Sequence, residues 1–436
     1  MTINESIIAQ KKGDCNKKAP LCKGGSAVGG GGLSIPPTSL ALGHLPLHQG
    51  GFFIGKRYAI YIETENPDSV KMWKILIFIY CRYIIPLGNL LDNRAFGEVN
   101  EMNNRIKYLD VAKFIGIFCI YLGHFGNSAG KAYPFVFAFH VPLFFFLSGF
   151  SETLSADVPF DKYIIKNIKS LLIPCWLFAL ASLLVVTIAQ NASSSIVPSL
   201  IDLLKGCIRN HYLAGSLWFL TCLFVIKIAF YVLRKIVKFK WLNLLICAAA
   251  YCVSQLLFDP KPTVDPHMVY NIDSACYFII FYALGYYGAG FIQSLLDWQK
   301  PIKKAICMGT GAVLFVYAAL LFFGKDLFAY IPPNTVTNLV IPVLRPVCII
   351  LFVLIVSRVL ENIAFFGSIG KNTLFLCGSE HIVRLCVPLC LQIVGLNIAC
   401  PNPLATYIYA FALLVLCNKT LVPLEKSAFK QLHLLK

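Results

Sequence analysis

Long apolar runs recur from about residue 108 to residue 421, and short polar segments separate them. Several runs approach or exceed the roughly 20 residues that cross a bilayer as a helix. We place ten candidate spans at 108–126, 134–151, 170–189, 215–233, 241–258, 275–292, 304–323, 338–357, 372–396 and 404–421. The pattern predicts an all-α, polytopic membrane protein with about ten transmembrane helices.

The composition agrees with this class. Hydrophobic residues make up 58% of the 436 residues and charged residues only 14%, whereas soluble domains carry about 25% charged residues. The formal net charge is +17, which raises the question of a nucleic-acid partner.

The distribution of basic residues answers that question. If the segment before the first span is cytoplasmic, the inner segments hold nineteen Lys and Arg residues and the outer loops hold five. Cytoplasmic loops of membrane proteins carry such an excess. We therefore expect both ends of the core to be cytoplasmic in a cell (inner) membrane, with the lipid bilayer and not nucleic acid as partner.

The first hundred residues differ from the rest. They contain the run GGSAVGGGG at 24–32 and scattered prolines, a composition that forms flexible coil. The one apolar run, 73–91, carries Lys74 and Arg82 and could lie on the membrane surface. We expect 1–101 to be a poorly structured, dispensable extension that need not belong to the natural product, and 102–436 to form the membrane domain.

Ionisable residues inside predicted spans need a reason, because each costs about 2.5–3.5 kcal/mol at the centre of a membrane helix. The first span carries Arg105, Asp110, Lys113 and His124. Asp110 and Lys113 are one turn apart and can pair. On a straight helix His124 lies about 21 Å beyond Asp110, which excludes a direct contact between them.

Other spans carry ionisable residues as well. His140 lies near the same end of its span as His124, and Glu380 stands four residues before Arg384, close enough to neutralise it. A general base and anion-binding groups would use these residue types. Structural ion pairs, or a proton-coupled transporter, would use them too, so the residues alone leave these alternatives open.

The 17 cysteines do not suggest a metal centre. Many lie inside apolar runs, and no Cys-x-x-Cys pair has a matching histidine pair. We expect unpaired, buried thiols and no metal site.

Five segments in order resemble a known family. They read RIKYLDVAKFIGIFCIYLGH, FHVPLFFFLSGF, LWFLTCLF, FYALGY and IGKNTLFLCGSEH, within a match from about residue 105 to residue 421. They resemble acyltransferase family 3, the integral membrane O-acyltransferases, and within it the fucose 4-O-acetylase-like acetyltransferases. The resemblance implies a ten-helix fold, acetyl-CoA as donor, and a hydroxyl of a cell-envelope or exported glycan, or of a lipid-linked sugar, as acceptor.

The resemblance also implies roles for residues. It maps the family's Arg, Asp and His of the first helix onto Arg105, Asp110 and His124, whereas Lys113 stands where the family often has a further Arg. His124 and Asp110 are the expected catalytic residues, and acetyl-CoA is expected at Arg105, Lys113 and Arg358. The residues expected around the acceptor are His140, Asp273, Glu380 and His381. The alternative function is a polysaccharide or small-solute transporter.

Overall fold

The computed structural model describes residues 105–155, 157–190, 196–211, 214–393, 400 and 402–431. The chain divides into two compact units, Met1–Leu42 and Gly43–Lys436, and every described residue belongs to the second. The predicted extension 1–101, with its apolar run 73–91, lies outside the described residues.

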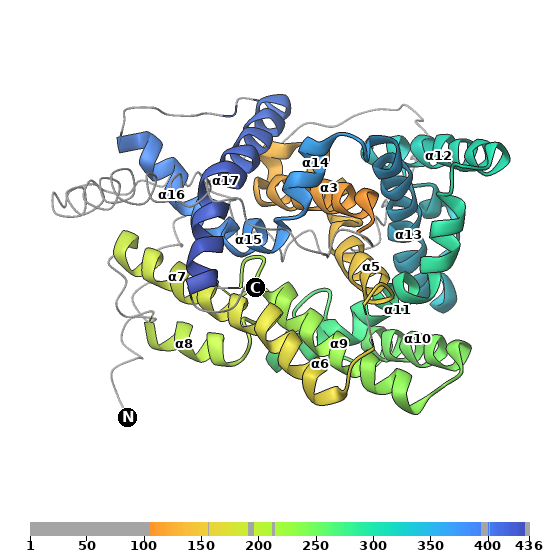
Figure 1. Cartoon of the computed structure of the whole chain (residues 1–436), viewed down its shortest axis with the longest axis horizontal. Coiled ribbons are helices and arrows are strands. Elements are labelled where there is room, and N and C mark those ends of the chain that lie inside the picture. The colour runs from red at the N-terminus through yellow and green to blue at the C-terminus, as the bar shows by residue number, and fades with distance from the viewer. Residues whose placement is uncertain are drawn as a thin grey trace, which may run out of the picture. The chain divides into compact units, whose positions relative to one another are not determined.

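The described chain consists of helices joined by turns and loops, and no strand occurs in it (Figure 1). The helices are α3 (Lys107–His124), α4 (Ala132–Phe137), α5 (His140–Glu152), α6 (Phe160–Asn167), α7 (Ile173–Gln190), α8 (Ile196–Leu204), α9 (Trp218–Ile236), α10 (Lys240–Leu256), α11 (Ile272–Leu295), α12 (Pro301–Phe322), α13 (Thr335–Leu360), α14 (Ala364–Gly370), α15 (Thr373–Gly378), α16 (Glu380–Ile393) and α17 (Pro403–Gln431). Short turns of other helix types are η4 (Gly126–Ala129), η5 (Ile168–Leu172), η7 (Val269–Asn271) and η8 (Leu327–Tyr330).

Each of the ten predicted spans coincides with helical structure, which confirms the all-α membrane class. Within the described ranges, six helical stretches are long and apolar enough to cross a membrane: Ala132–Glu152, Phe160–Val185, Val269–Leu295, Pro301–Phe322, Thr335–Leu360 and Pro403–Gln431. The second predicted span is built from α4 and α5, and the ninth from α15 and α16. The total of ten crossings stays a prediction.

Helix α3 lies at the centre of the fold. Thirteen of its 18 residues are buried, and it packs against α4, α5, α13, α14, α15 and α17. Because Asp110 is buried by these helices, the first predicted span can carry a charge there that a lipid-facing helix could not.

Two glycines let α5 and α11 approach closely. A Cβ on Gly149 would overlap the carbonyl of Tyr282, and a Cβ on Gly285 would overlap the carbonyl of Phe146. Small residues of this kind allow membrane helices to pack backbone against backbone. The contact fixes α5, which follows the first span, against the core helix α11.

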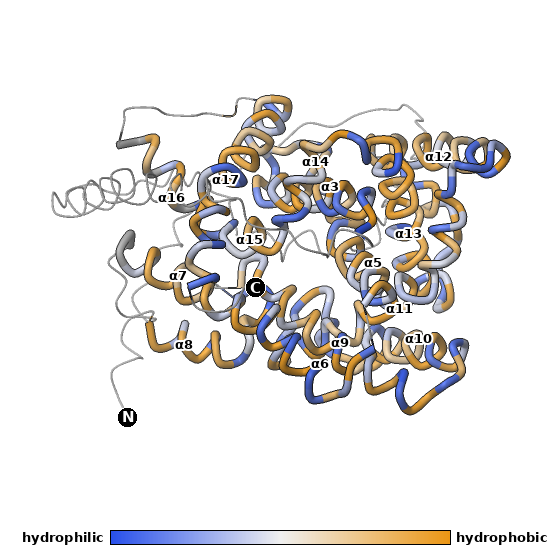
Figure 2. Tube along the Cα trace, viewed as in Figure 1, coloured by the Kyte–Doolittle hydropathy of each residue, from blue (hydrophilic) through white to orange (hydrophobic). Residues whose placement is uncertain are grey.

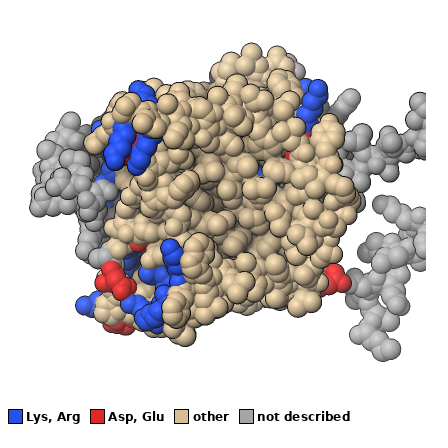
Figure 3. Space-filling model, turned by 90° about the vertical axis from the view of Figure 1, so that its right-hand side faces the viewer, with Lys and Arg blue, Asp and Glu red and all other residues tan. Residues whose placement is uncertain are grey.

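The outer helices present apolar side chains away from the protein interior. Only 22% of the apolar window of α12 is buried, against 61% for α11, and Val313, Phe315 and Val316 of α12 are exposed. Figure 2 shows apolar residues along almost every helix. On the side that carries α10, α12 and α13 in Figure 1, charged side chains gather towards the edges and leave a broad uncharged middle (Figure 3). A lipid bilayer is the environment that suits such a surface.

Candidate active site

An acid at the start of α3 is held by two cations. Asp110 accepts hydrogen bonds from Arg105 Nε at 2.8 Å and Arg105 Nη2 at 3.1 Å. The predicted pairing with Lys113 is present, with 3.9 Å between Lys113 Nζ and Asp110 Oδ1. Two parallel charge-assisted bonds fix the orientation of the Arg105 guanidinium relative to the Asp110 carboxylate. The rim at this end of α3 is therefore basic, with a buried carboxylate beneath it.

At the other end of α3, a histidine meets an acid from a distant part of the sequence. Segment 370–380 runs alongside α3: a Cβ on Gly370 would overlap the carbonyl of Asp110, and Tyr121 Oη donates to the carbonyl of Leu376 at 3.2 Å. Residue numbers rise in the same direction along both segments, so His124 and Glu380 come next to each other beyond these two contacts. Their atoms Nδ1 and Oε1 are 2.6 Å apart.

The environment of this pair is apolar and enclosed. The Glu380 side chain is only 3% exposed, whereas that of His124 is 19% exposed. A buried carboxylate needs a partner because desolvation penalises its charge, and the imidazole supplies one. The Nδ1–H direction is not aligned with Oε1, and Glu380 Oε2 has no hydrogen-bond partner among the described residues. Catalytic hydrogen bonds often tighten only when substrate binds.

A small cavity of about 50 Å³ opens beside the pair. It is lined by Tyr121, His124, Phe125, Glu380, Val383, Arg384, Pro388, Tyr409 and Leu413. Arg384 Nε lies 3.7 Å from Glu380 Oε1, so the predicted ion pair is present. His381 is buried, and its Cβ lies 3.5 Å from the position that a Cβ on Gly215 would take. The arrangement combines an imidazole, a carboxylate that can orient it, and a guanidinium.

A family model described as an acyltransferase domain matches residues 106–420. The chain belongs to acyltransferase family 3. It is therefore a membrane acyltransferase, and this membership favours the enzyme over the transporter alternative. The match contains His124, Glu380 and every other predicted site residue except Arg105, which precedes it by one position. Searches of curated proteins and of solved structures found no match.

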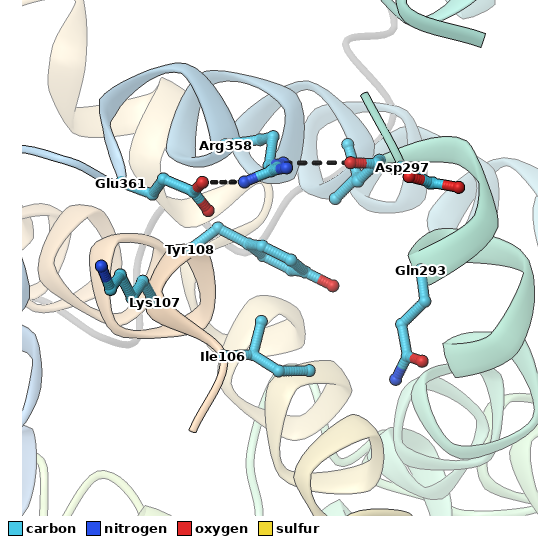
Figure 4. A pocket seen from close by; sticks show the side chains of 8 residues that line it. Ile106, Lys107, Tyr108, Gln293, Asp297, Arg358 and Glu361 are labelled. Atoms are coloured by element: carbon cyan, nitrogen blue, oxygen red, sulfur yellow. Dashed lines mark hydrogen bonds and ion pairs between the residues drawn. The ribbon is translucent and has the colours of Figure 1, made fainter. Parts of the chain in front are cut away.

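The acyltransferase has a second, larger pocket of about 350 Å³ at the Arg105 end of α3. Arg358 forms one wall: it pairs with Glu361, and its Nε donates to the carbonyl of Leu296 at 3.0 Å. Figure 4 shows the Tyr108 ring and the Lys107 side chain across from Arg358, with Gln293 on the far side. The Arg358 guanidinium also stacks on Trp298, 5.2 Å from the ring centre.

Two predicted acceptor residues of the acyltransferase lie outside both pockets. His140 Nδ1 is 2.6 Å from the carbonyl oxygen of Val136, one turn earlier in the chain. Asp273 accepts backbone N–H bonds from His267 at 2.8 Å and Met268 at 3.1 Å, where α11 begins. The structure therefore brings together His124, Glu380 and Arg384, and it does not bring His140 or Asp273 into their cavity.

Sequence reasoning missed several partners. Arg358 is surrounded by Glu361, Tyr108 and Trp298. Of these three, only Glu361 could have been found from the sequence, because it lies three residues after Arg358. The pairing of His124 with Glu380 had no local signal at all. Arg345 of α13 is paired with Asp326, with 2.5 Å between Arg345 Nη2 and Asp326 Oδ2. Across the described ranges, no group of three or more His, Cys, Asp or Glu residues could hold a metal ion.

Proposed function

We propose that this acyltransferase moves an acetyl group from acetyl-CoA to a hydroxyl of a cell-envelope or exported glycan, as in the fucose 4-O-acetylase-like branch. The observation that carries the proposal is the 2.6 Å contact between His124 Nδ1 and Glu380 Oε1. An imidazole held by a carboxylate at one nitrogen is set up to act as a general base at the other. In this proposal the nitrogen turned to the acceptor is His124 Nε2, because Nδ1 is the one that contacts Glu380.

The transfer then needs one proton relay. His124 Nε2 takes the proton of the acceptor hydroxyl while that oxygen attacks the thioester carbonyl carbon. The carbon–sulfur bond breaks, and Nε2 returns the proton to the departing sulfur, which leaves an acetyl ester and coenzyme A. Glu380 stabilises the transient imidazolium, and Arg384 supplies positive charge for the carbonyl oxygen as it becomes negative.

The donor enters at the Arg105 end of α3 in this proposal. Arg105, Lys113 and Arg358 contribute positive charge around that end, and guanidinium groups bind phosphate oxygens in pairs. Asp110 fixes the Arg105 guanidinium at the rim, where 48% of its side chain is exposed. Since coenzyme A is cytoplasmic, the proposal puts the Arg105 end on the cytoplasmic side of the inner membrane. With the predicted ten spans, both ends of the core would lie on that side. The acceptor sugar would then approach from the His124 end, where His381 lies and where His140 and Asp273 are proposed to contribute.

The test is transfer of label from [¹⁴C]acetyl-CoA to a panel of glycan acceptors by the purified protein. His124→Ala should lower the rate by about 10²–10⁴-fold, the usual effect of losing a general base. His267→Ala serves as the matched control, since His267 is a half-exposed histidine distant in sequence from this pair. Normal transfer by a folded His124→Ala variant would overturn the assignment.

A further inference from the structure

Two loops, segments 202–211 and 261–273, are joined by hydrogen bonds of one side chain. Asn271 donates from Nδ2 to the carbonyls of Gly206 and Cys207, both at 3.2 Å, and to Thr221 Oγ1 at 2.9 Å. Its Oδ1 accepts the backbone N–H of Arg209 at 2.8 Å. One buried amide therefore joins segment 202–211 to segment 261–273.

The backbone of these loops is held in a conformation that most residues avoid. Every non-glycine residue with positive φ in the described ranges lies here: Cys207, Asn210, Tyr270 and Asn271. Such conformations cost free energy and persist only where the surroundings enforce them, which is common at binding sites.

The locked loops present an acid–histidine pair. His211 Nδ1 lies 2.7 Å from Asp202 Oδ1, with 45% of the histidine side chain exposed and only 10% of the aspartate side chain. Burial raises the pKa of Asp202, and the nearby His211 opposes that rise. Because Nδ1 is occupied by Asp202, the ring is held in one orientation and Nε2 is left for a ligand.

The same segment leads directly to the candidate active site. Gly215 packs beside His381, and Ser216 Oγ donates to the carbonyl of Cys377 at 2.5 Å. Cys377 lies three residues before Glu380. A ligand bound at His211 would therefore lie a few residues along the chain from contacts with His381 and Cys377, which are close in sequence to Glu380.

The chemistry around His211 suits a neutral ligand rich in hydroxyl groups. One arginine, Arg209, stands two residues before His211; its Nη2 donates to the carbonyl of Pro262 at 2.5 Å and its guanidinium lies over the Trp218 ring. The exposed charges of the two loops are of both signs, Lys205 and Asp265 among them. A phosphate or sulfate would require a cluster of cations, whereas an imidazole and a carboxylate are partners for sugar hydroxyls.

We propose that the Asp202–His211 pair is a carbohydrate-binding subsite, which holds sugar units next to the one that is acetylated. This inference rests on the proposed function. The subsite would give affinity for a glycan chain without taking part in the chemical step.

The experiment measures binding and transfer separately. The probe is the polysaccharide fraction extracted from the envelope of the source cells, titrated calorimetrically into the purified full-length protein. His211→Ala should weaken its binding by about tenfold, the loss expected for one or two hydrogen bonds. In the transfer assay the same variant should raise KM for the polysaccharide, while KM for acetyl-CoA and the rate with monosaccharide methyl glycosides stay unchanged.

Two further variants separate this role from a structural one. Asp202→Asn should weaken binding as His211→Ala does, because the ring loses its charged anchor. His267→Ala, a half-exposed histidine on the same loops without the short acid contact, should bind normally. Unchanged binding by a folded His211→Ala protein, equal loss in His267→Ala, or no binding of the polysaccharide to the wild type would overturn the inference. Absence of acetyl transfer with binding intact would instead contradict the proposed function alone.

Discussion

At the scale of single residues, two buried carboxylates are each paired with basic side chains. Asp110 is paired with Arg105, and Glu380 contacts both His124 and Arg384. Leaving either acid alone would cost several kcal/mol, because a buried charge without a partner is poorly solvated. The two pairs differ in what the partner can do, since an arginine stays protonated and a histidine can exchange a proton near neutral pH.

Glu380→Gln tests the orienting role of the acid. Glutamine keeps the shape of the side chain and removes the negative charge that stabilises the imidazolium. We expect kcat to fall by about 10²-fold or more, while the Kd for acetyl-CoA stays unchanged. Steady-state kinetics together with a donor-binding titration measures both. A loss of donor affinity with kcat intact would place Glu380 in substrate binding instead.

Arg105 tests the donor side. Arg105→Ala should weaken acetyl-CoA binding by about tenfold or more and affect the acceptor less, because phosphate contacts are charge-assisted. Arg105→Lys keeps the charge and loses the two-bond contact with Asp110, so an intermediate affinity is expected. Equal losses for donor and acceptor in a titration of both substrates would indicate that Arg105 acts only structurally.

At the scale of elements, the break in the ninth span puts Glu380 at the start of a helix. Helix α15 ends at Gly378 and α16 begins at Glu380, so the carboxylate stands in the first turn of a helix. The backbone N–H groups of a first turn favour a negative charge. In a continuous helix these N–H groups would be bonded within the helix and could not support the charge.

The contact of α5 with α11 gives a prediction about stability. Gly285→Ala should strongly reduce the yield of folded protein, because its Cβ would overlap the carbonyl of Phe146. Gly309→Ala in α12 is the matched control. Nothing lies within 4 Å of its Cβ position, and alanine favours a helix by about 1 kcal/mol over glycine. Size-exclusion profiles and thermal unfolding in detergent compare the two variants, and equal behaviour would contradict the tight packing.

At the scale of the whole molecule, the charge pattern orients the protein. The nineteen-to-five distribution of basic residues predicts the Arg105 end of α3 in the cytoplasm. The proposed donor pocket at Arg358 lies at this same end. The charge pattern and the proposed mechanism therefore both predict that this pocket opens to the cytoplasm. Reporter fusions after Lys240 and after Asp265 should report opposite sides of the membrane. Reports from the same side would contradict the ten-span topology.

The extension 1–101 gives a prediction for the whole chain. The family match begins at residue 106 and the first described helix at Lys107. We expect protein expressed from Met102 to insert into membranes and to transfer acetyl groups at the full-length rate. Membrane yield and transfer measured side by side provide the comparison, and an inserted but inactive truncated protein would show that the extension contributes to activity.

The membrane class and the locations of the apolar spans follow from the sequence alone, whereas the division of two spans into α4 and α5 and into α15 and α16 does not. Each apolar run is a local signal, because a helix satisfies its backbone hydrogen bonds within its own segment. The sequence also determined the pairs that lie three or four residues apart, such as Asp110 with Lys113 and Glu380 with Arg384. Neighbours on one helix face follow from helix geometry alone.

Which distant residues meet depends on the packing of the helices. The contact of His124 with Glu380 depends on how segment 370–380 lies along α3, and no local pattern encodes that register. Both α3 and α12 were predicted as spans, and only the packing shows that α3 is central and α12 peripheral, since lipid and protein interior are both apolar. For the same reason, His140 and Asp273 seemed equivalent to Glu380 in the sequence, and only packing placed them apart from it.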